Sequence, residues 1–235
     1  MISVCMTTYN GQEYVEEQIN SILCQLGPND ELIVSDDGSS DLTLILVKDI
    51  IANDARVKLL SGPREGLIKN FENALLEAKG KYIFLADQDD VWHSNKVEKF
   101  MECFNVYKSE LVLSDAYITD SNLNVVENSF FKCNKSQKGF TKNLIKNSYL
   151  GCCLAFKREL LADVLPFPSC IPMHDWWIGI VSEYKNRNIV FLNESLLYYR
   201  RHGSNVSPTG ERSPYSLIKK ISFRLQILNS LIRLG

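Results

Sequence analysis

The sequence lacks the features that define several large protein classes. No apolar run is long enough to span a bilayer, and no charged leader followed by an apolar stretch begins the chain. The net charge is −2 and the first 200 residues contain no basic block, so a nucleic-acid partner is not expected. The scattered cysteines described next lack a disulfide framework and so favour the reducing cytoplasm.

The cysteines lack the spacing of a metal or disulfide site. Seven are scattered along the chain and none forms a CxxC pair, which supports neither a disulfide framework nor a zinc site. No GxGxxG follows the first apolar run, so a dinucleotide oxidoreductase is disfavoured.

What the chain does contain is a regular alternation of strand and helix patterns in its first hundred residues. Expected strands are "ISVCM", "ELIVS", "RVKLL" and "KYIFLA", and the expected helices between and after them are "EYVEEQINSILCQL", "LTLILVKDIIAND", "LIKNFENALLEAKG" and "NKVEKFMECFNVY". This rhythm predicts an α/β fold with a mostly parallel sheet between helices.

The second half is less regular. We expect a strand at 110–120, a long loop over 121–148, and a strand turning into a helix at 149–165. A helix is predicted over "MHDWWIGIVSEY", and a strand pair or strand and loop over 189–205.

Three polar turns follow the predicted parallel strands: "TTYN" (7–10), "SDDGSSD" (35–41) and "DQDD" (87–90). Ligands of such sheets bind beyond the carboxyl ends of the strands, so these turns should converge on one crevice. In the third turn, Asp87, Asp89 and Asp90 follow a buried-looking run at once, as expected for a Mg²⁺ or Mn²⁺ site. The alternative is a solvated turn that also caps the next helix.

Further candidates each have a simpler structural explanation. An Asp in "SDDGSSD" can accept from the imide of a pyrimidine base or merely shape the turn, and Tyr9 can stack on a base or pack on the sheet. In "MHDWW", Asp175 is a candidate general base beside two indoles, or a residue favoured at a helix start. In "YYRRHGSN", two arginines and His202 would face a diphosphate and a metal, or form an exposed charged loop.

The last 22 residues carry four basic and no acidic side chains. A helical wheel groups five apolar residues on one face: Leu217, Ile221, Leu225, Leu228 and Ile232. This pattern is typical of a helix in the interface of an anionic membrane, although docking on the domain or on a partner subunit would also explain it.

Taken together, "VCMTTYNGQEYVEEQINSIL", "IVSDDGSSD", "GLIKNFENAL", "YIFLADQDDVW", "YLGCCLAFKREL", "HDWW" and "YYRRHGSNVS" resemble the inverting, nucleotide-sugar-dependent glycosyltransferases of family 2, which have the GT-A fold. The resemblance covers residues 1 to about 207. It is strongest to the branch that builds bacterial O-antigen and capsule repeat units, which includes rhamnosyl-, glucosyl- and galactosyltransferases. It implies a nucleotide-sugar-binding half (1–115), an acceptor-binding half (116–207) and an amphipathic helical tail (208–235).

The resemblance also implies roles for individual residues. Nucleotide binding falls to Thr7, Tyr9, Asp37, Lys69 (where the family usually has Arg), Asp87 and Gln88. The metal ligands are Asp89, Asp87 and His202, the general base is Asp175, and acceptor binding is assigned to Trp92, His174 and Trp176. Many members have Glu-Asp where this chain has His174-Asp175.

The activity implied is transfer of a sugar from UDP or dTDP, with Mn²⁺ or Mg²⁺, to a saccharide acceptor. By resemblance the acceptor is linked to polyprenyl diphosphate at the inner face of the cytoplasmic membrane, and a homodimer is left open. Two rivals are a haloacid-dehalogenase-type phosphatase with Asp87 as nucleophile, and a non-catalytic nucleotide-sugar-binding protein.

Overall fold

The N-terminal half of the computed structural model, which describes residues 1–203 and 215–234, alternates strands and helices as predicted. Its elements are β1 (Ile2–Thr8), α1 (Val15–Leu23), β2 (Glu31–Asp36), α2 (Thr43–Asn53), β3 (Val57–Ser61), α3 (Leu67–Glu77), β4 (Tyr82–Ala86), β5 (Val91–Trp92) and α4 (Lys96–Val106). β1 and β2 are buried along their whole length, because helices cover both faces of the sheet there.

The second half contains more structure than the sequence suggests. It comprises β6 (Leu111–Thr119), β7 (Val125–Glu127), α5 (Phe130–Asn134), α6 (Phe140–Ile145), a 3-10 turn (Gly151–Cys153), β8 (Leu154–Lys157), a second 3-10 turn (Arg158–Leu160), α7 (Leu161–Val164), α8 (His174–Tyr184), β9 (Ile189–Arg200) and α9 (Leu217–Ile232).

One expectation for this half is wrong, and one pair of alternatives is decided. The predicted loop at 121–148 contains β7, α5 and α6, because Phe130 and Phe131 anchor the segment in the core. Of the two alternatives predicted over 189–205, a strand pair or a strand and loop, the structure has the second: one continuous strand, β9, pairs with β6 and β5 and ends at Arg200.

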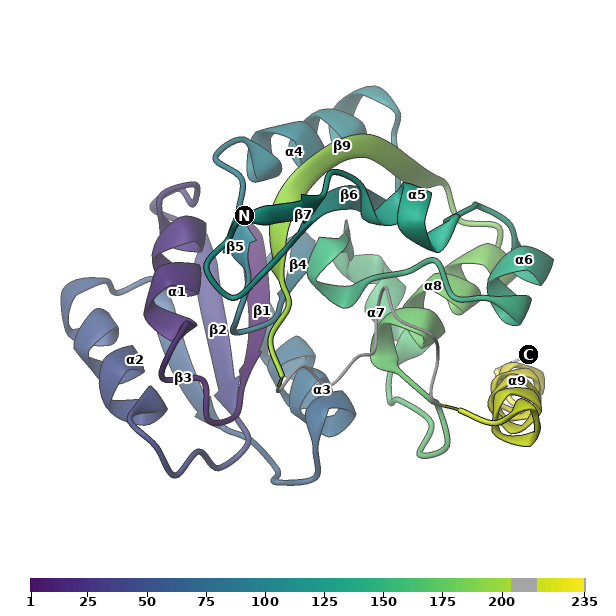
Figure 1. The fold of residues 1–235 in the computed structure, drawn as a ribbon, viewed down its shortest axis with the longest axis horizontal. Helices are drawn as coiled ribbons and strands as arrows, with labels where there is room; N and C mark the ends of the chain where they lie inside the picture. Colours follow the sequence, from purple (N-terminus) through teal and green to yellow (C-terminus); the bar gives the residue numbers. More distant parts are fainter. Residues whose placement is uncertain (204–214, 235) are drawn as a thin grey trace.

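One sheet runs through both halves in the order β3-β2-β1-β4-β8-β6-β9-β5, with β7 beside β6. The first four strands are parallel, β8 is antiparallel to both of its neighbours, and β9 is parallel to β6. In Figure 1, β9 arches across the top of the molecule and ends near the lower ends of the parallel strands. The predicted α/β class is confirmed.

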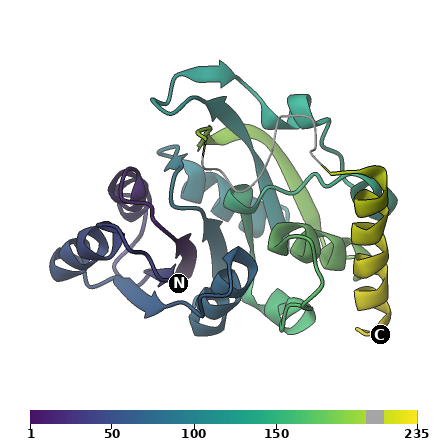
Figure 2. The same cartoon turned by 60° about the horizontal axis from the view of Figure 1, so that its bottom comes forward.

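The predicted division of the chain is only partly visible in this sheet. The boundary at 115/116 falls inside β6, and the boundary at 207/208 lies outside the described residues. The predicted tail helix is present as α9, which lies along one edge of the molecule (Figure 2). Among the residues that the structure describes, no helix combines the length and apolarity that a bilayer crossing requires.

Candidate active site

The three polar turns meet at the carboxyl edge of the parallel strands, as predicted. The Thr8 hydroxyl of β1 donates to Asp36 Oδ2 of β2 over 2.8 Å. The side-chain amide of Gln88 clamps Tyr9: it accepts from the Tyr9 N–H over 2.8 Å and donates to the Tyr9 carbonyl over 3.0 Å. Gly11 leaves room for this amide, because a Cβ at Gly11 would lie 2.3 Å from Gln88 Oε1. The turn at residues 87–90, which we call the acidic turn, is therefore fastened to the end of β1.

Asp37 orders the loop between β3 and α3. Its carboxylate accepts from the N–H groups of Arg64 over 2.7 Å and Gly66 over 2.8 Å. These bonds hold Arg64 in a left-handed conformation, with φ of 61°. Each carboxylate oxygen can accept more than one hydrogen bond, so a nucleotide base can still donate to Asp37.

The other predicted nucleotide residues differ in accessibility. The side chain of Tyr9 is 58% exposed and available for stacking, whereas Thr7 is buried within β1. The ammonium of Lys69 on α3 pairs with Glu72 at 3.0 Å. The structure thus brings Tyr9, Asp37 and Gln88 to one edge of the sheet, and the nucleotide contacts of all these residues stay predictions.

Two of the predicted metal ligands are direct neighbours. His202 Nε2 lies 2.8 Å from Asp89 Oδ2, although 113 residues separate them in the chain. Both side chains are about one-seventh exposed, at 15% and 14%, so solvent and ligands reach them. The ring of Tyr14 packs against His202, with 5.0 Å between ring centroids. A carboxylate and an imidazole so placed fit a divalent cation that also binds phosphate oxygens.

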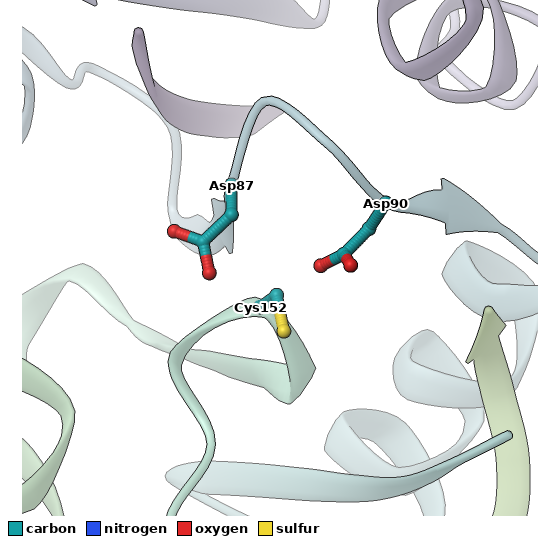
Figure 3. A group of neighbouring side chains, drawn as sticks. All are labelled: Asp87, Asp90 and Cys152. Atoms are coloured by element: carbon teal, nitrogen blue, oxygen red, sulfur yellow. The ribbon is translucent and has the colours of Figure 1, made fainter. Parts of the chain in front are cut away.

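A second group of possible metal ligands lies deeper in the protein than the Asp89–His202 pair. The carboxylates of Asp87 and Asp90 point toward the segment that contains Cys152 (Figure 3), and the ligand atoms of these three residues all lie within 4.8 Å of one another. Burial, and after it the charges of Asp89 and Asp175, raises the pKa of Asp87 to about 7. Burial and the neighbouring acids also raise the pKa of Asp90 well above its usual range. Asp90 and Cys152 are fully buried, so of these three only Asp87 can take part in an accessible cation site.

A buried lysine lies beside this deeper group. Lys96 of α4 is fully buried, and its ammonium donates to the Cys152 carbonyl over 2.6 Å. Desolvation lowers the pKa of Lys96, and nearby thiol and carboxyl groups oppose that shift. The ammonium also lies 4.4 Å from the ring centroid of Trp92, which is only 3% exposed. Trp92 therefore packs in the core, and its predicted acceptor contact would require this ring to be uncovered.

Arg200 fastens the acidic turn to two other segments. Its Nε donates to the Asp89 carbonyl over 2.8 Å, Nη1 donates to the Ser121 carbonyl over 2.6 Å, and Nη2 pairs with Glu17 at 2.5 Å. Its backbone N–H donates to Asp90 over 3.0 Å. Arg200 is 4% exposed, so it does not belong to an exposed charged loop, and its contact with a diphosphate stays a prediction. Arg200 instead holds the turn that presents Asp89.

Asp175 lies in the first turn of α8. Its carboxylate accepts from the Trp176 N–H over 2.6 Å. Desolvation raises the pKa of Asp175 to about 7, against the lowering effect of the N–H groups of Trp176 and Gly151. A carboxyl group with this pKa exchanges protons readily at neutral pH, which suits a general base. Its charge also acts on Asp87, so the base candidate and the acidic turn belong to one site.

The two predicted acceptor residues beside Asp175 are enclosed. The ring of His174 stacks on Phe71 with 4.0 Å between centroids, and within the described part of the chain neither ring nitrogen has a hydrogen-bond partner. Desolvation lowers the pKa of His174 to about 3, so the ring is neutral. Trp176 Nε1 donates to the Asn143 carbonyl over 2.8 Å. Their acceptor contacts stay predictions.

Sequence reasoning missed three residues of the site. Cys152 and Lys96 look like an ordinary core cysteine and a surface lysine of a helix. Gln18, in α1, donates to the Asp87 carbonyl over 2.8 Å. No local pattern marks these residues, because their roles arise from the packing of distant elements around the acidic turn.

The fold and site define the class of the protein. The fold is the GT-A fold: S. aureus TarS 1-349 in complex with UDP-GlcNAc is similar with a TM-score of 0.74 and 22% identity, covering 97% of this chain and 66% of that one. The mannosyltransferase PcManGT from Pyrobaculum calidifontis, in complex with GDP-Man and Mn²⁺, is similar with a TM-score of 0.68 and 17% identity, covering 100% of this chain and 64% of that one. This chain therefore spans about two thirds of these solved chains.

The chain belongs to glycosyl transferase family 2, whose family model matches residues 3–165. It is 30% identical to the UDP-Glc:alpha-D-GlcNAc-diphosphoundecaprenol beta-1,3-glucosyltransferase WfgD of Escherichia coli, over 88% of this chain and 79% of that protein. It is 25% identical to the dTDP-rhamnosyl transferase RfbG of Shigella flexneri, over 94% of this chain and 82% of that protein. The predicted family is confirmed, and the protein is a glycosyltransferase rather than a phosphatase or a non-catalytic binding protein.

Proposed function

We propose that the protein is an inverting glycosyltransferase that moves a sugar from a UDP- or dTDP-sugar to a hydroxyl group of a saccharide acceptor. One observation carries this proposal. Asp175, with its pKa raised to about 7, acts electrostatically on Asp87 in the same turn that presents the Asp89–His202 pair. A base and a candidate cation site in one cluster are what a direct displacement at a sugar carbon requires.

The N-terminal half would hold the donor. Tyr9 is exposed for stacking on the base, and Asp37 offers a carboxylate for its imide N–H. Thr7, Lys69 and Gln88 complete the proposed nucleotide site, with Asp87 and Gln88 directed to the ribose. The clamp between Gln88 and Tyr9 fixes the relative position of the base-binding and phosphate-binding turns.

Asp89, His202 and Asp87 would hold a divalent cation, Mn²⁺ or Mg²⁺. Their donor types, two carboxylates and an imidazole, suit such ions, and the Asp89–His202 pair is accessible whereas Asp90 is sealed. A cation bound there would stabilise the negative charge that develops on the leaving diphosphate. Arg200 would keep the backbone of Asp89 in place for this role.

Asp175 would act as the general base. Its ionised carboxylate accepts the proton of the acceptor hydroxyl while that oxygen bonds to the anomeric carbon. The bond from this carbon to the diphosphate oxygen breaks, and the electron pair leaves with the nucleoside diphosphate. With one base and attack from the face opposite the leaving group, the anomeric configuration inverts.

The acceptor proposed is a saccharide linked to polyprenyl diphosphate, in the synthesis of a bacterial surface polysaccharide such as O-antigen or capsule. The names of WfgD and RfbG, a diphosphoundecaprenol glucosyltransferase and a dTDP-rhamnosyl transferase, support this acceptor and donor class. The enzyme would then work at the inner face of the cytoplasmic membrane, with α9 in contact with the bilayer. Trp92, His174 and Trp176 are the residues proposed near the acceptor.

The test combines donor binding with transfer. In a thermal-shift panel of UDP, dTDP, GDP and their sugars, one nucleotide should raise the melting temperature of the protein. The rise should be larger when Mn²⁺ is present. With the donor so identified, Asp89→Ala and Asp175→Asn should each lose transfer by roughly a hundredfold or more while keeping the folded circular-dichroism spectrum. Unchanged turnover in either variant would refute the role of that residue.

A further inference from the structure

The tail helix α9 carries apolar side chains on two faces. One face packs on the domain, where Ile227 and Leu231 are buried. The other is open to solvent, with Ile218 82%, Ile221 57% and Leu225 54% exposed. Of the five residues predicted from sequence to form one apolar face, four are exposed on this open side, and Leu228 is half-buried. The face that packs on the domain was not predicted.

The end of α6 extends this open face. The Arg224 guanidinium of α9 donates to the carbonyl of Ile145, whose side chain is 66% exposed. Lys142 and Lys146 beside Ile145 are exposed as well. Figures 1 and 2 show α6 and α9 together at the same edge of the molecule. Two segments that are far apart in sequence thus present a single apolar and basic surface.

The charge of these segments has one sign. Residues 140–146 contain two Lys and no Asp or Glu, and residues 215–234 contain four Lys or Arg and no Asp or Glu. The whole chain has slightly more acidic than basic residues, 28 against 26, so this surface departs from its average. A second copy of the chain on the same face would bring like charges together. An anionic partner is favoured instead.

We propose that the open face of α9 and the end of α6 form one docking surface for an anionic lipid bilayer. This inference rests on the proposed function, whose acceptor is a lipid-linked saccharide, and it adds α6 to the contact. Ile145, Ile218 and Ile221 would enter the boundary between headgroups and acyl chains. Lys142, Lys219 and the neighbouring basic groups would lie at the lipid phosphates.

The docked face of α9 connects this surface to the catalytic helix. The Ser230 hydroxyl lies 3.4 Å from the Cys170 thiol, in the segment that leads from α7 into α8. Asp175 follows five residues later, in the first turn of α8. A bilayer that binds α9 is therefore held at a defined position relative to the general base.

Co-sedimentation with vesicles tests the proposal on the full chain. Vesicles of equal parts phosphatidylglycerol and phosphatidylcholine should bind the protein, and phosphatidylcholine alone should bind it at least about tenfold more weakly. Added salt should weaken the binding, because the attraction is electrostatic. Equal binding to both vesicles would overturn the proposal.

Paired substitutions test the contribution of α6. Lys142→Glu with Ile145→Ser should weaken binding to the anionic vesicles about tenfold or more, and Lys219→Glu with Ile218→Ser should do the same. The control matched to the α6 pair, Lys48→Glu with Ile45→Ser, changes the same residue types three positions apart on exposed positions of α2 and should bind as the unaltered chain does. If the α6 pair behaves like the control, α6 is not part of the surface.

Two further readouts complete the test. Light scattering without lipid should give a monomer. A dimer that dissociates when Lys219→Glu and Ile218→Ser are introduced would assign the face to a second copy and overturn the proposal.

Transfer to a lipid-free acceptor analogue should be unaffected by the α6 pair. Vesicle binding without any transfer would contradict the proposed activity, whereas transfer without vesicle binding would contradict only the lipid surface.

Discussion

The two halves of the sheet hold their functional groups by different means. In the N-terminal half, Tyr9, Asp37 and the acidic residues lie in turns directly after parallel strands, and hydrogen bonds such as those of Thr8 and Gln88 join the turns. In the C-terminal half, Asp175 begins a helix and His202 follows the longest strand. Local patterning thus builds the proposed donor side, whereas the proposed acceptor side depends on long-range packing, and Arg200 joins the two.

Removing Arg200 should have the largest effect, because it breaks the connection between the halves. Arg200→Met leaves the carbonyls of Asp89 and Ser121 and the carboxylate of Glu17 without their donor, and should lower the free energy of unfolding by about 3 kcal/mol. Urea unfolding measures this change. Arg233→Met, at the exposed position directly after α9, is the control and should cost less than about 0.5 kcal/mol. Equal effects would mean that Arg200 does not join the halves.

A second experiment sharpens the comparison on the acceptor side. The pKa of Asp175 is raised to about 7 from an ordinary value of 3.8, so the folded state favours the protonated form. The stability that Asp175 contributes is fully present below pH 3.8, its pKa in the unfolded chain. It is lost as the pH rises through about 7, its pKa in the folded protein. Asp175→Asn should therefore gain stability relative to the unaltered protein by roughly 2 to 3 kcal/mol between pH 5 and pH 8.5.

Urea unfolding at both pH values measures that gain, and a constant difference between the two proteins would contradict the raised pKa. Transfer by the unaltered enzyme should have the opposite dependence, rising to a plateau above about pH 7, because the base must be ionised. The ionised form of Asp175 would then be required for activity, although it lowers the stability of the folded protein.

On the donor side we expect a smaller effect. Gln88→Leu removes the two hydrogen bonds to Tyr9 and should raise the KM for the donor about tenfold, a loss of about 1 to 2 kcal/mol. The exposed Gln137→Leu serves as the control. A fall in kcat with an unchanged KM would place Gln88 in the chemical step rather than in donor binding.

The sequence predicted the N-terminal half well because apolar periodicity and turn residues are local signals. It predicted that the three polar turns converge, since parallel strands end at one edge of the sheet. It did not predict the environment of Trp92, whose position beside the acidic turn suggested an acceptor contact. Whether that indole is covered depends on β9 and on Lys96, and the sequence around residue 92 gives no sign of either contact.

The segment 121–148 was mispredicted for a related reason. Its many Lys and Asn residues resemble those of a loop, yet Phe130 and Phe131 reach the core and short helices form around them. A short amphipathic helix with one turn of apolar contacts gives too weak a periodicity to detect from sequence. Tertiary packing decides its structure.

The pairing of β9 with β6 is irregular in the middle of the strand. Ser114 pairs with Leu192 and Asp115 with Ser195, so Asn193 and Glu194 of β9 have no counterpart in β6, and a second shift follows between Asp115 and Tyr117. Extra residues of this kind bend a strand and increase its local twist. Beyond them the ladder resumes and runs to Arg200, two residues before His202. The direction in which the chain leads His202 to Asp89 therefore depends on bulges in the middle of β9, and not only on the residues of the candidate cation site.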